Sequence, residues 1–246
     1  MKKNGLKIYV VAHKPCNLVS NDTYYPIQVN AEQNKHFLAI TDDMGDNISK
    51  KNSRFCELTA LYWIWKHDLN SQYIGLCHYR RYFKFKKGIK DYWKAIFEQS
   101  ELNENEISIH NRILKILDDD YVIVPKKNKL DGRTVEEHYC KFHNADDLST
   151  LKNIVLKKYP DYDAAWKITF SRKWMYAYNM FVMNRTLFQQ YMEWLFDILF
   201  EVEKYVPPKT DAYQNRTFGF MSERLFNVFL EYQKCKVKEL PIIFLT

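Results

Sequence analysis

The sequence predicts an α/β fold with a mainly parallel sheet flanked by helices. Short, almost wholly apolar segments, typical of strands buried on both faces, alternate with longer segments whose apolar residues recur at helical spacing. This alternation is most regular in the first half of the chain and favours parallel strands joined through helices. Because no repeat, low-complexity tract or linker interrupts the 246 residues, we expect one domain over residues 1–246.

The first half of the chain contains most of the predicted strands. Ser53 is the expected N-cap of a helix over 54–67, whose apolar residues share one face. A polar, mainly helical segment is expected over 88–119. Strands are expected at 6–13, 37–40, 73–77 and 121–125.

The second half of the chain is predominantly helical. Two short helices are expected within 134–158, before Pro160, and a long amphipathic helix over 185–204 is expected to end before Pro207 and Pro208. The remaining predicted elements are a strand at 176–184, a helix at 218–233 and a last strand at 237–245.

The charge balance argues against a nucleic-acid partner. The 37 Lys and Arg residues exceed the 30 Asp and Glu residues by seven, but they are spread along the chain. Nucleic-acid-binding proteins usually concentrate their basic residues in a patch. The excess fits phosphate-bearing small molecules or an anionic membrane surface.

The cysteines and the N-terminal segment predict a cytosolic protein. The five cysteines are odd in number and form no Cys-x-x-Cys pair, which indicates reduced thiols. The first apolar run is short and interrupted by Lys7, so we interpret it as a strand and not as a signal peptide. No segment approaches the roughly 18 apolar residues that cross a membrane.

Several common catalytic motifs are absent from the sequence. It contains no G-x-G-x-x-G, Walker or G-x-S-x-G pattern. These absences argue against a dinucleotide enzyme, an NTPase and an α/β hydrolase.

Polar residues follow four of the predicted strands. In open α/β sheets, ligands bind beyond the carboxyl ends of the strands. We therefore expect the polar groups at these ends to meet in one crevice. They are His13–Lys14, Asp42–Asp43, His78–Arg81 and Lys126–Lys127.

The segment YIGLCHYRRYF, residues 73–83, places Arg80 and Arg81 directly after a buried strand. Guanidinium groups offer a planar fork of donors that matches phosphate oxygens, and they stay charged at any relevant pH. Tyr79 and Tyr82 are candidates for stacking on a base or a sugar. The alternative is that both arginines form ordinary surface ion pairs.

Three further groups are candidates with strong structural alternatives. Asp42 and Asp43 could hold a metal or a ribose, although Asp is also common in tight turns. The segment EHYCKFH matches no common zinc spacing, but Tyr139 and His143 share a helix face that could contact a substrate. Glu223, near the start of a helix, is a candidate general base or simply a favourable charge at that helix end.

Five segments, in this order, closely resemble a bacterial family encoded among capsular-polysaccharide, exopolysaccharide and O-antigen genes. The family was long catalogued only as a domain of unknown function. The similarity covers nearly the whole chain, and GLCHYRRYF is its most distinctive part. The segments are KIYVVAHKP, DDMGDNISKKNSRFCELTALYWIWKH, YIGLCHYRRYF, YNMFVMNRTLFQQYMEWLFDILFEVEK and YQNRTFGFMSERLFNVFL.

The resemblance implies a GT-A-like, Rossmann-like fold and a glycosyltransferase activity. Characterised relatives are galactofuranosyltransferases that use UDP-galactofuranose. In many GT-A enzymes of similar layout, the corresponding strand ends in Asp-x-Asp, which binds a metal on the nucleotide diphosphate. Here His78-Tyr79-Arg80 stands in that place. We therefore expect arginine to neutralise the diphosphate in place of a metal. If a metal does bind, Asp42 and Asp43 are its expected ligands.

The expected reaction transfers a sugar, with galactofuranose as the group that the resemblance implies, from a UDP-sugar to a polysaccharide or lipid-linked oligosaccharide. The enzyme would be cytoplasmic, with the inner face of the cell membrane as the alternative location. Expected donor-binding residues are His13, Lys14, Asp42, Asp43, Asn47, His78, Arg80 and Arg81. Glu223 is the first candidate base, followed by Glu57 and Asp43, and Asn179, Tyr139 and His143 are expected on the acceptor side.

A different class of function is also consistent with the sequence. The chain could be a catalytically silent nucleotide- or glycan-binding module of a polysaccharide assembly complex. An enzyme should release UDP slowly from its donor even without an acceptor, whereas a binding module should not.

Overall fold

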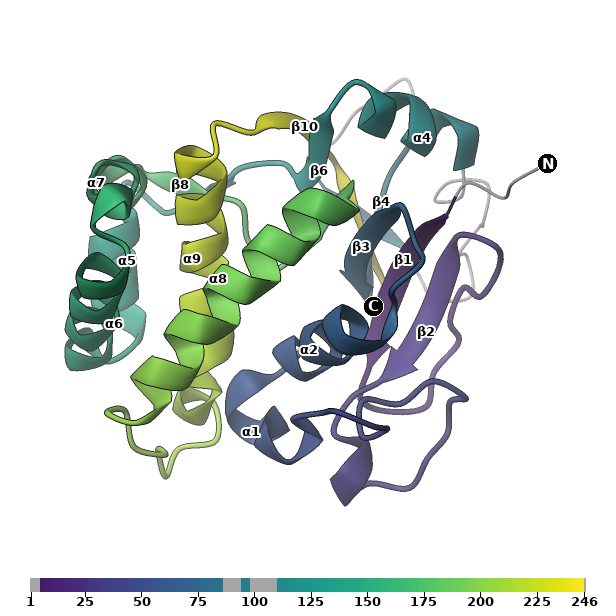
Figure 1. The fold of residues 1–246 in the computed structure, drawn as a ribbon, viewed down its shortest axis with the longest axis horizontal. Helices are drawn as coiled ribbons and strands as arrows, with labels where there is room; N and C mark the ends of the chain where they lie inside the picture. The colour runs from purple at the N-terminus through teal and green to yellow at the C-terminus, as the bar shows by residue number, and fades with distance from the viewer. Residues whose placement is uncertain (1–4, 86–93, 98–109, 246) are drawn as a thin grey trace.

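The computed structural model describes residues 5–85, 94–97 and 110–245. Within this part of the chain, one nine-stranded sheet runs through the molecule, in the order β2-β1-β3-β9-β6-β10 with β4, β11 and β5 continuing from β3 (Figure 1). The strands are β1 (Leu6–Ala12), β2 (Tyr24–Gln28), β3 (Tyr73–His78), β4 (Arg81–Phe83), β5 (Lys94–Phe97), β6 (Tyr121–Pro125), β9 (Phe181–Asn184), β10 (Lys236–Leu240) and β11 (Ile242–Leu245). A separate two-stranded sheet pairs β7 (Asn128–Lys129) with β8 (Trp174–Met175).

The large sheet is mainly parallel, as the sequence predicts. Strand β1 runs parallel to β2 and β3, β10 to β6, and β11 to β5. Strand β9 is antiparallel to both β3 and β6, and β4 is antiparallel to both β3 and β11. Only β4 and β9 are therefore reversed among the nine strands of this sheet.

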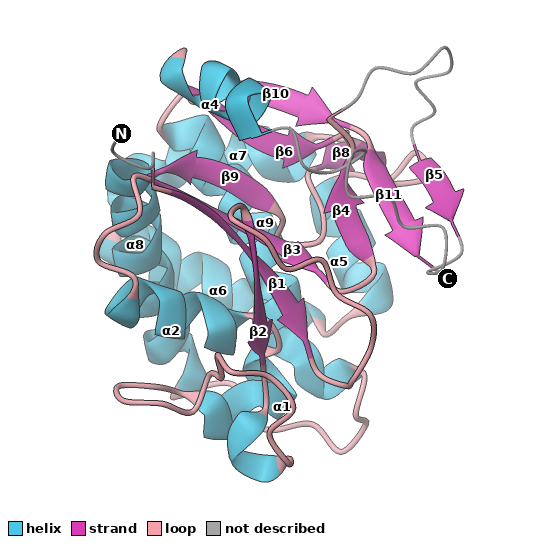
Figure 2. Cartoon of the chain, turned by 90° about the vertical axis from the view of Figure 1, so that its right-hand side faces the viewer, coloured by secondary structure: helices cyan, strands magenta, loops and turns pink. Residues whose placement is uncertain are grey.

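Helices cover both faces of the sheet (Figure 2). In β1, Tyr9 and Val11 pack into the cluster that includes α2, α8 and α9, whereas Ile8 and Val10 pack against α4 on the other face. This alternation explains why every residue of the strand except Lys7 is apolar or aromatic. The helices are α1 (Asn52–Phe55), α2 (Leu58–His67), α4 (His110–Asp118), α5 (Val135–Phe142), α6 (Ala145–Lys158), α7 (Asp163–Ser171), α8 (Arg185–Glu203) and α9 (Thr217–Tyr232). Short 3-10 turns lie at Ala31–Gln33, Ser49–Lys51, Pro160–Tyr162 and Gln214–Arg216.

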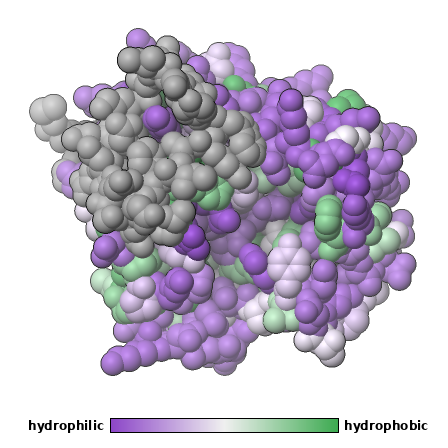
Figure 3. Space-filling view, turned by 180° about the vertical axis from the view of Figure 1, so that it is seen from behind, coloured by the Kyte–Doolittle hydropathy of each residue, from purple (hydrophilic) through white to green (hydrophobic). Residues whose placement is uncertain are grey.

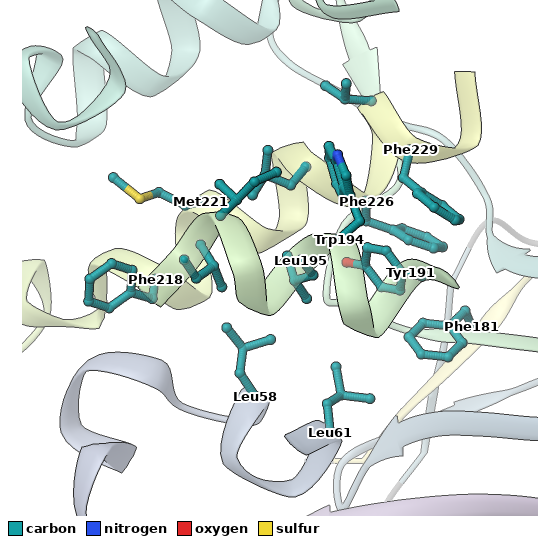
Figure 4. Close-up of a cluster of buried hydrophobic side chains, with 14 of the residues drawn as sticks. Leu58, Leu61, Phe181, Tyr191, Trp194, Leu195, Phe218, Met221, Phe226 and Phe229 are labelled. Atoms are coloured by element: carbon teal, nitrogen blue, oxygen red, sulfur yellow. The ribbon is translucent and has the colours of Figure 1, made fainter. Parts of the chain in front are cut away.

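The larger part of the core lies between α2, α8, α9 and the sheet (Figure 4). Tyr191 and Leu195 of α8 meet Phe226 of α9, and Phe181 of β9 closes the cluster. Fully burying one such side chain contributes about 1.5–3 kcal/mol. Gly75 of β3 allows β9 to come close, because a Cβ atom there would lie 2.9 Å from the Phe181 carbonyl oxygen.

Caps define several helix starts. Thr134 and Glu137 form a reciprocal capping box at α5, and the Asn184 side chain accepts a hydrogen bond from the Leu187 N–H at α8. The predictions for 134–158, 185–204 and 218–233 are confirmed to within a few residues.

The predicted strand at 37–40 is wrong. The fully buried amide of Gln28 accepts the Phe37 N–H at 2.8 Å and donates to the Lys35 carbonyl at 3.1 Å. One glutamine side chain thus satisfies backbone groups that a neighbouring strand would otherwise pair. The strand that pairs with β1 on this side is β2, which the sequence analysis missed.

Three other predicted elements are interrupted. The helix over 54–67 breaks at Cys56, and the strand over 176–184 begins only at Phe181. The strand over 237–245 divides into β10 and β11 at Pro241, which lacks an N–H to donate. Of the helical segment expected over 88–119, β5 and α4 are described, and 88–93 and 98–109 lie outside the described residues.

The surface is predominantly hydrophilic on the face shown in Figure 3, which is hollowed near its centre. None of the helices in the described ranges has the length and apolar character needed to cross a membrane.

Candidate active site

A cleft of about 630 Å³ opens at the carboxyl ends of β1, β2 and β3. Its floor and walls come from these strand ends, the α1–α2 junction, a turn before β9, and the start of α9. This is the edge where an open α/β sheet binds its ligands. The cleft is lined by Val11, His13, Val29, Asn52, Ser53, Cys56, Glu57, His78, Tyr79, Arg81, Tyr178, Ala212, Asn215, Arg216 and Glu223.

The turn at Tyr178–Asn179 organises the floor of the cleft. Both residues have positive φ, 76° and 51°, a conformation that is uncommon for residues other than glycine. The Tyr178 N–H donates to the Glu223 carboxylate at 2.7 Å, and the Asn179 amide donates to the Glu57 carboxylate at 2.6 Å. His78 Nε2 donates to the Tyr178 carbonyl at 2.6 Å. One strained turn therefore orients three titratable side chains, as such turns often do at functional sites.

Glu57 reaches the cleft because the helix breaks just before it. Cys56 has φ 52° and ψ −130°, which an L-residue adopts only at a cost of about 1–3 kcal/mol. The Asn179 amide that holds Glu57 also donates to Ser222 Oγ at 2.8 Å, so α9 supports the same contact. The break turns Glu57 out of the regular helix and toward the turn at Tyr178–Asn179.

Glu223 lies opposite on the first half of α9, with 21% of its side chain exposed. One carboxylate oxygen accepts the Tyr178 N–H, and the other accepts from Arg224 Nη1 at 3.1 Å. Arg224 is itself buried and also donates to the Phe220 carbonyl. Glu223 is therefore a partly accessible carboxylate held from two sides.

Burial shifts the protonation of the groups on the cleft floor. It raises the pKa of Glu57, against the hydrogen bond from Asn179 that lowers it. Burial also raises the pKa of Glu223, an effect that Arg224 opposes and the nearby Glu57 charge reinforces. Burial, helped by the Arg81 charge, lowers the pKa of His78 to about 4. At neutral pH, His78 is thus an uncharged donor.

The guanidinium groups of Arg81 and Arg216 face the cleft. Arg81 stacks over the Tyr178 ring, with Cζ 4.9 Å from the ring centroid, and Arg216 Nε donates to Cys56 Sγ at 3.4 Å. Neither side chain forms an ion pair with any carboxylate among the described residues. Such unpaired arginines beside a cleft provide a site for a phosphate-bearing ligand.

Aromatic and basic side chains gather on the β1 side of the cleft. The His13 and Tyr79 rings meet edge to face at 5.1 Å, and Lys14 Nζ lies 5.9 Å from the Tyr79 ring centroid. Burial and the Lys14 charge lower the pKa of His13. A flat group and an anion could both be contacted there.

The other predicted donor-binding residues lie elsewhere. Arg80 is exposed, and its Nε donates to the Leu245 carbonyl at 2.8 Å, outside the cleft lining. Asp42 is fully buried and accepts from the Asn30 N–H, the Ala31 N–H and Ser49 Oγ, so it holds a loop together. Asp43 contacts His36 Nε2 at 2.7 Å, and Asn47 donates to the carbonyls of Asp43 and Gly45.

The residues predicted on the acceptor side are divided between two places. Asn179 lies beneath the cleft, where it holds Glu57. Tyr139 and His143 line a separate groove beside α5. Lys126 lines a third hollow, and Lys127 forms an ion pair with Glu239, so the four polar strand ends do not all meet.

No group of three or more His, Cys, Asp or Glu side chains is arranged to hold a metal ion among the residues that the structure describes. Asp42 does not fit as a metal ligand, because three protein donors already engage its carboxylate.

Sequence reasoning missed Arg216, Cys56 and Tyr178 as cleft residues. Arg216 stands in the polar segment TDAYQNRT directly before a predicted helix, which was the available signal. Nothing in the sequence indicated the positive φ angles of Cys56 and Tyr178, since neither residue is Gly, Asn or Asp.

Comparisons with known proteins agree with this architecture. A family model described as a domain of unknown function (DUF4422) matches residues 7–234. Among solved structures, the chain is similar to the apo structure of WbbM, a bifunctional glycosyltransferase, with a TM-score of 0.91 and 31% sequence identity. The match covers 99% of this chain and 46% of that one, so the chain spans less than half of that protein's length. No curated protein sequence matches the chain significantly.

Proposed function

The chain belongs to the family described as a domain of unknown function, DUF4422, and from that premise we propose that it is a glycosyltransferase. The family resemblance and the α/β fold class expected from the sequence are confirmed. The proposed reaction moves a sugar, with galactofuranose as the expected group, from a UDP-sugar to a glycan or lipid-linked glycan. Its proposed setting is capsule, exopolysaccharide or O-antigen biosynthesis.

The observation that carries the proposal is that one cleft contains two arginines, which form no ion pair within the described residues, and two carboxylates, which are held by hydrogen bonds. Arg81, Arg216, Glu57 and Glu223 line the same cleft. In this proposal the two arginines neutralise the diphosphate. Transfer of a sugar from a nucleotide needs both a stabilised leaving group and a base for the incoming hydroxyl. Tyr79 and His13 are proposed to contact the nucleoside.

The proposed step can be written with its atoms balanced. The acceptor hydroxyl oxygen bonds to the anomeric carbon, while the bond between that carbon and the phosphate oxygen breaks. The electron pair of the broken bond leaves on UDP, whose charge Arg81 and Arg216 offset. The hydroxyl proton passes to the Glu223 carboxylate, which the Tyr178 N–H holds in place.

The first expected result is UDP release without an added metal. Purified protein incubated with UDP-galactofuranose should release UDP slowly in EDTA, because arginines and not a metal offset the diphosphate charge in this proposal. Release is measured by a coupled UDP assay, with GDP-, CMP- and dTDP-sugars as comparisons. Absence of UDP release from every UDP-sugar tested, with manganese or without it, would favour the silent binding module.

The pH dependence of turnover provides a second test. A general base works in its deprotonated form, so the rate should fall as pH decreases through the pKa of Glu223. Burial raises that pKa above its usual value of 4.5, and the acidic limb of the profile should lie above 4.5 as well. His78, with a pKa of about 4, should add no limb near neutrality. The profile of kcat against pH checks this, and a rate independent of pH from 4.5 upward would contradict it.

A further inference from the structure

A second hollow, the α5 groove, lies beside the proposed active site. It has a volume of about 380 Å³ and lies between the end of α5, the start of α6, and the segment that leads into α9. Its lining includes Phe142, His143, Asp147, Lys209, Gln214 and Phe220.

Aromatic rings form one wall of the α5 groove. His143 stacks on Phe220 with ring centroids 4.0 Å apart and lies 6.2 Å from the Tyr213 ring at the rim. Phe142 and Tyr213 are 44% and 54% exposed, respectively. Exposed rings that gather at one groove provide flat faces for a ligand with an apolar side.

Polar groups also line the α5 groove. The buried Asp147 carboxylate accepts from Lys209 Nζ at 3.0 Å, and the Gln214 amide donates to the Phe142 carbonyl at 3.0 Å. Burial lowers the pKa of His143 to about 4, so this ring is neutral at physiological pH. The groove thus offers aromatic faces together with hydrogen-bonding groups, which is the composition that suits an uncharged polyhydroxylated ligand.

The α5 groove and the active-site cleft share a wall. Ala212, Asn215 and Arg216 face the cleft, whereas Gln214 and Thr217 from the same segment face the groove. The Arg216 guanidinium carbon lies 6.0 Å from the Tyr213 ring centroid and 5.7 Å from that of Phe220. Tyr213 therefore belongs to the segment that separates the cleft from the groove.

We propose that the α5 groove is a glycan subsite that binds a sugar ring of the acceptor, apart from the ring that carries the reacting hydroxyl. The proposal rests on the proposed glycosyltransferase function. The sugar would stack its apolar face on Tyr213 and Phe142 and direct hydroxyl groups toward Asp147 and Gln214. The subsite would let the protein recognise a glycan longer than the single residue that it modifies.

The test measures sugar binding directly. Saturation-transfer NMR is recorded on the full chain with methyl glycosides of galactose, glucose, N-acetylglucosamine and rhamnose, in the presence of UDP. At least one glycoside should show transfer with the parent protein. Its affinity should fall about two- to tenfold in Phe142→Ala and Tyr213→Ala, because each variant removes one aromatic face. Both rings are exposed, so the variants should unfold at close to the parental temperature.

Tyr232→Ala is the matched control, since Tyr232 is also an exposed tyrosine but lies at the far end of α9 from Phe220. It should leave glycoside binding unchanged. The proposal is overturned if no glycoside binds the parent, or if binding survives in both groove variants. Protection of the parent against thermal unfolding by UDP is measured separately. If UDP protects the protein but no glycoside binds, the groove proposal fails while the donor proposal stands.

Discussion

Replacing Glu223 with glutamine is expected to lower turnover about a hundred- to ten-thousand-fold, while donor affinity stays close to parental. Glutamine keeps the size of the side chain and an oxygen to accept the Tyr178 N–H, but it cannot take a proton from the acceptor. The donor diphosphate is expected to contact Arg81 and Arg216, so its binding does not depend on Glu223. The rate of transfer and the UDP affinity, measured on the same preparation, separate the two effects.

The same substitution should destabilise the fold only moderately. Buried Arg224 loses its carboxylate acceptor, because the single amide oxygen of glutamine stays with the Tyr178 N–H, but Arg224 keeps the Phe220 carbonyl as an acceptor. We expect a loss on the order of 1–3 kcal/mol in the free energy of unfolding. Thermal unfolding therefore accompanies the kinetic measurement, to show that the variant is folded at the assay temperature.

Glu231→Gln is the matched control on the same helix. Glu231 pairs with Arg172 near the end of α9, away from the cleft, and its loss should leave turnover unchanged. If Glu223→Gln transfers sugar at the parental rate, the base lies elsewhere. Glu57, the other carboxylate on the cleft floor, would then be the next candidate.

Replacing Arg81 with alanine is expected to weaken UDP binding about 10- to 150-fold, whereas Arg80→Ala should change it little. The two residues are adjacent in the sequence and carry the same charge, so each is the best control for the other. Arg81 stacks on Tyr178 at the cleft, and Arg80 is directed to the Leu245 carbonyl outside it. The estimate for Arg81 corresponds to the loss of one charge-assisted interaction.

Calorimetric titration of UDP into both variants measures this difference. Adding salt should weaken UDP binding to the parent more than to Arg81→Ala, because the variant has lost one of the screened charges. Equal affinities for UDP in the parent and in Arg81→Ala would place the diphosphate elsewhere. A larger loss in Arg80→Ala than in Arg81→Ala would instead favour the β4–β11 edge as the binding site.

The alternation of apolar segments was sufficient to predict the layered fold, since burial on both faces leaves a direct record in composition. Strand β1 and helices α8 and α9 follow that pattern closely. The local irregularities could not be predicted from that pattern. The Gln28 side-chain amide bonds the backbone groups that a neighbouring strand would pair. Cys56 breaks a helix, although the apolar residues keep their helical spacing across the break. Both depend on tertiary contacts that no local pattern records.

Part of the cleft could be predicted from the positions of the predicted strands. His13, His78 and Arg81 follow strands, and parallel strands bring their ends to one edge. Glu57 and Glu223 could be proposed as carboxylates but not placed, because their meeting depends on the turn at Tyr178–Asn179. The same rule misplaced Asp42, since a carboxylate in a turn serves equally well as an acceptor for its own loop.

The turn at Tyr178–Asn179 also bears on how such a protein could diversify. Its partners come from β3, the α1–α2 junction and α9, so the groups proposed to handle the proton rest on elements that pack into the core. The proposed recognition residues His13, Lys14 and Tyr213 stand instead on exposed loops, where substitutions are tolerated. A lineage could therefore exchange one sugar specificity for another through changes at the rim, while inheriting the chemistry of the floor intact.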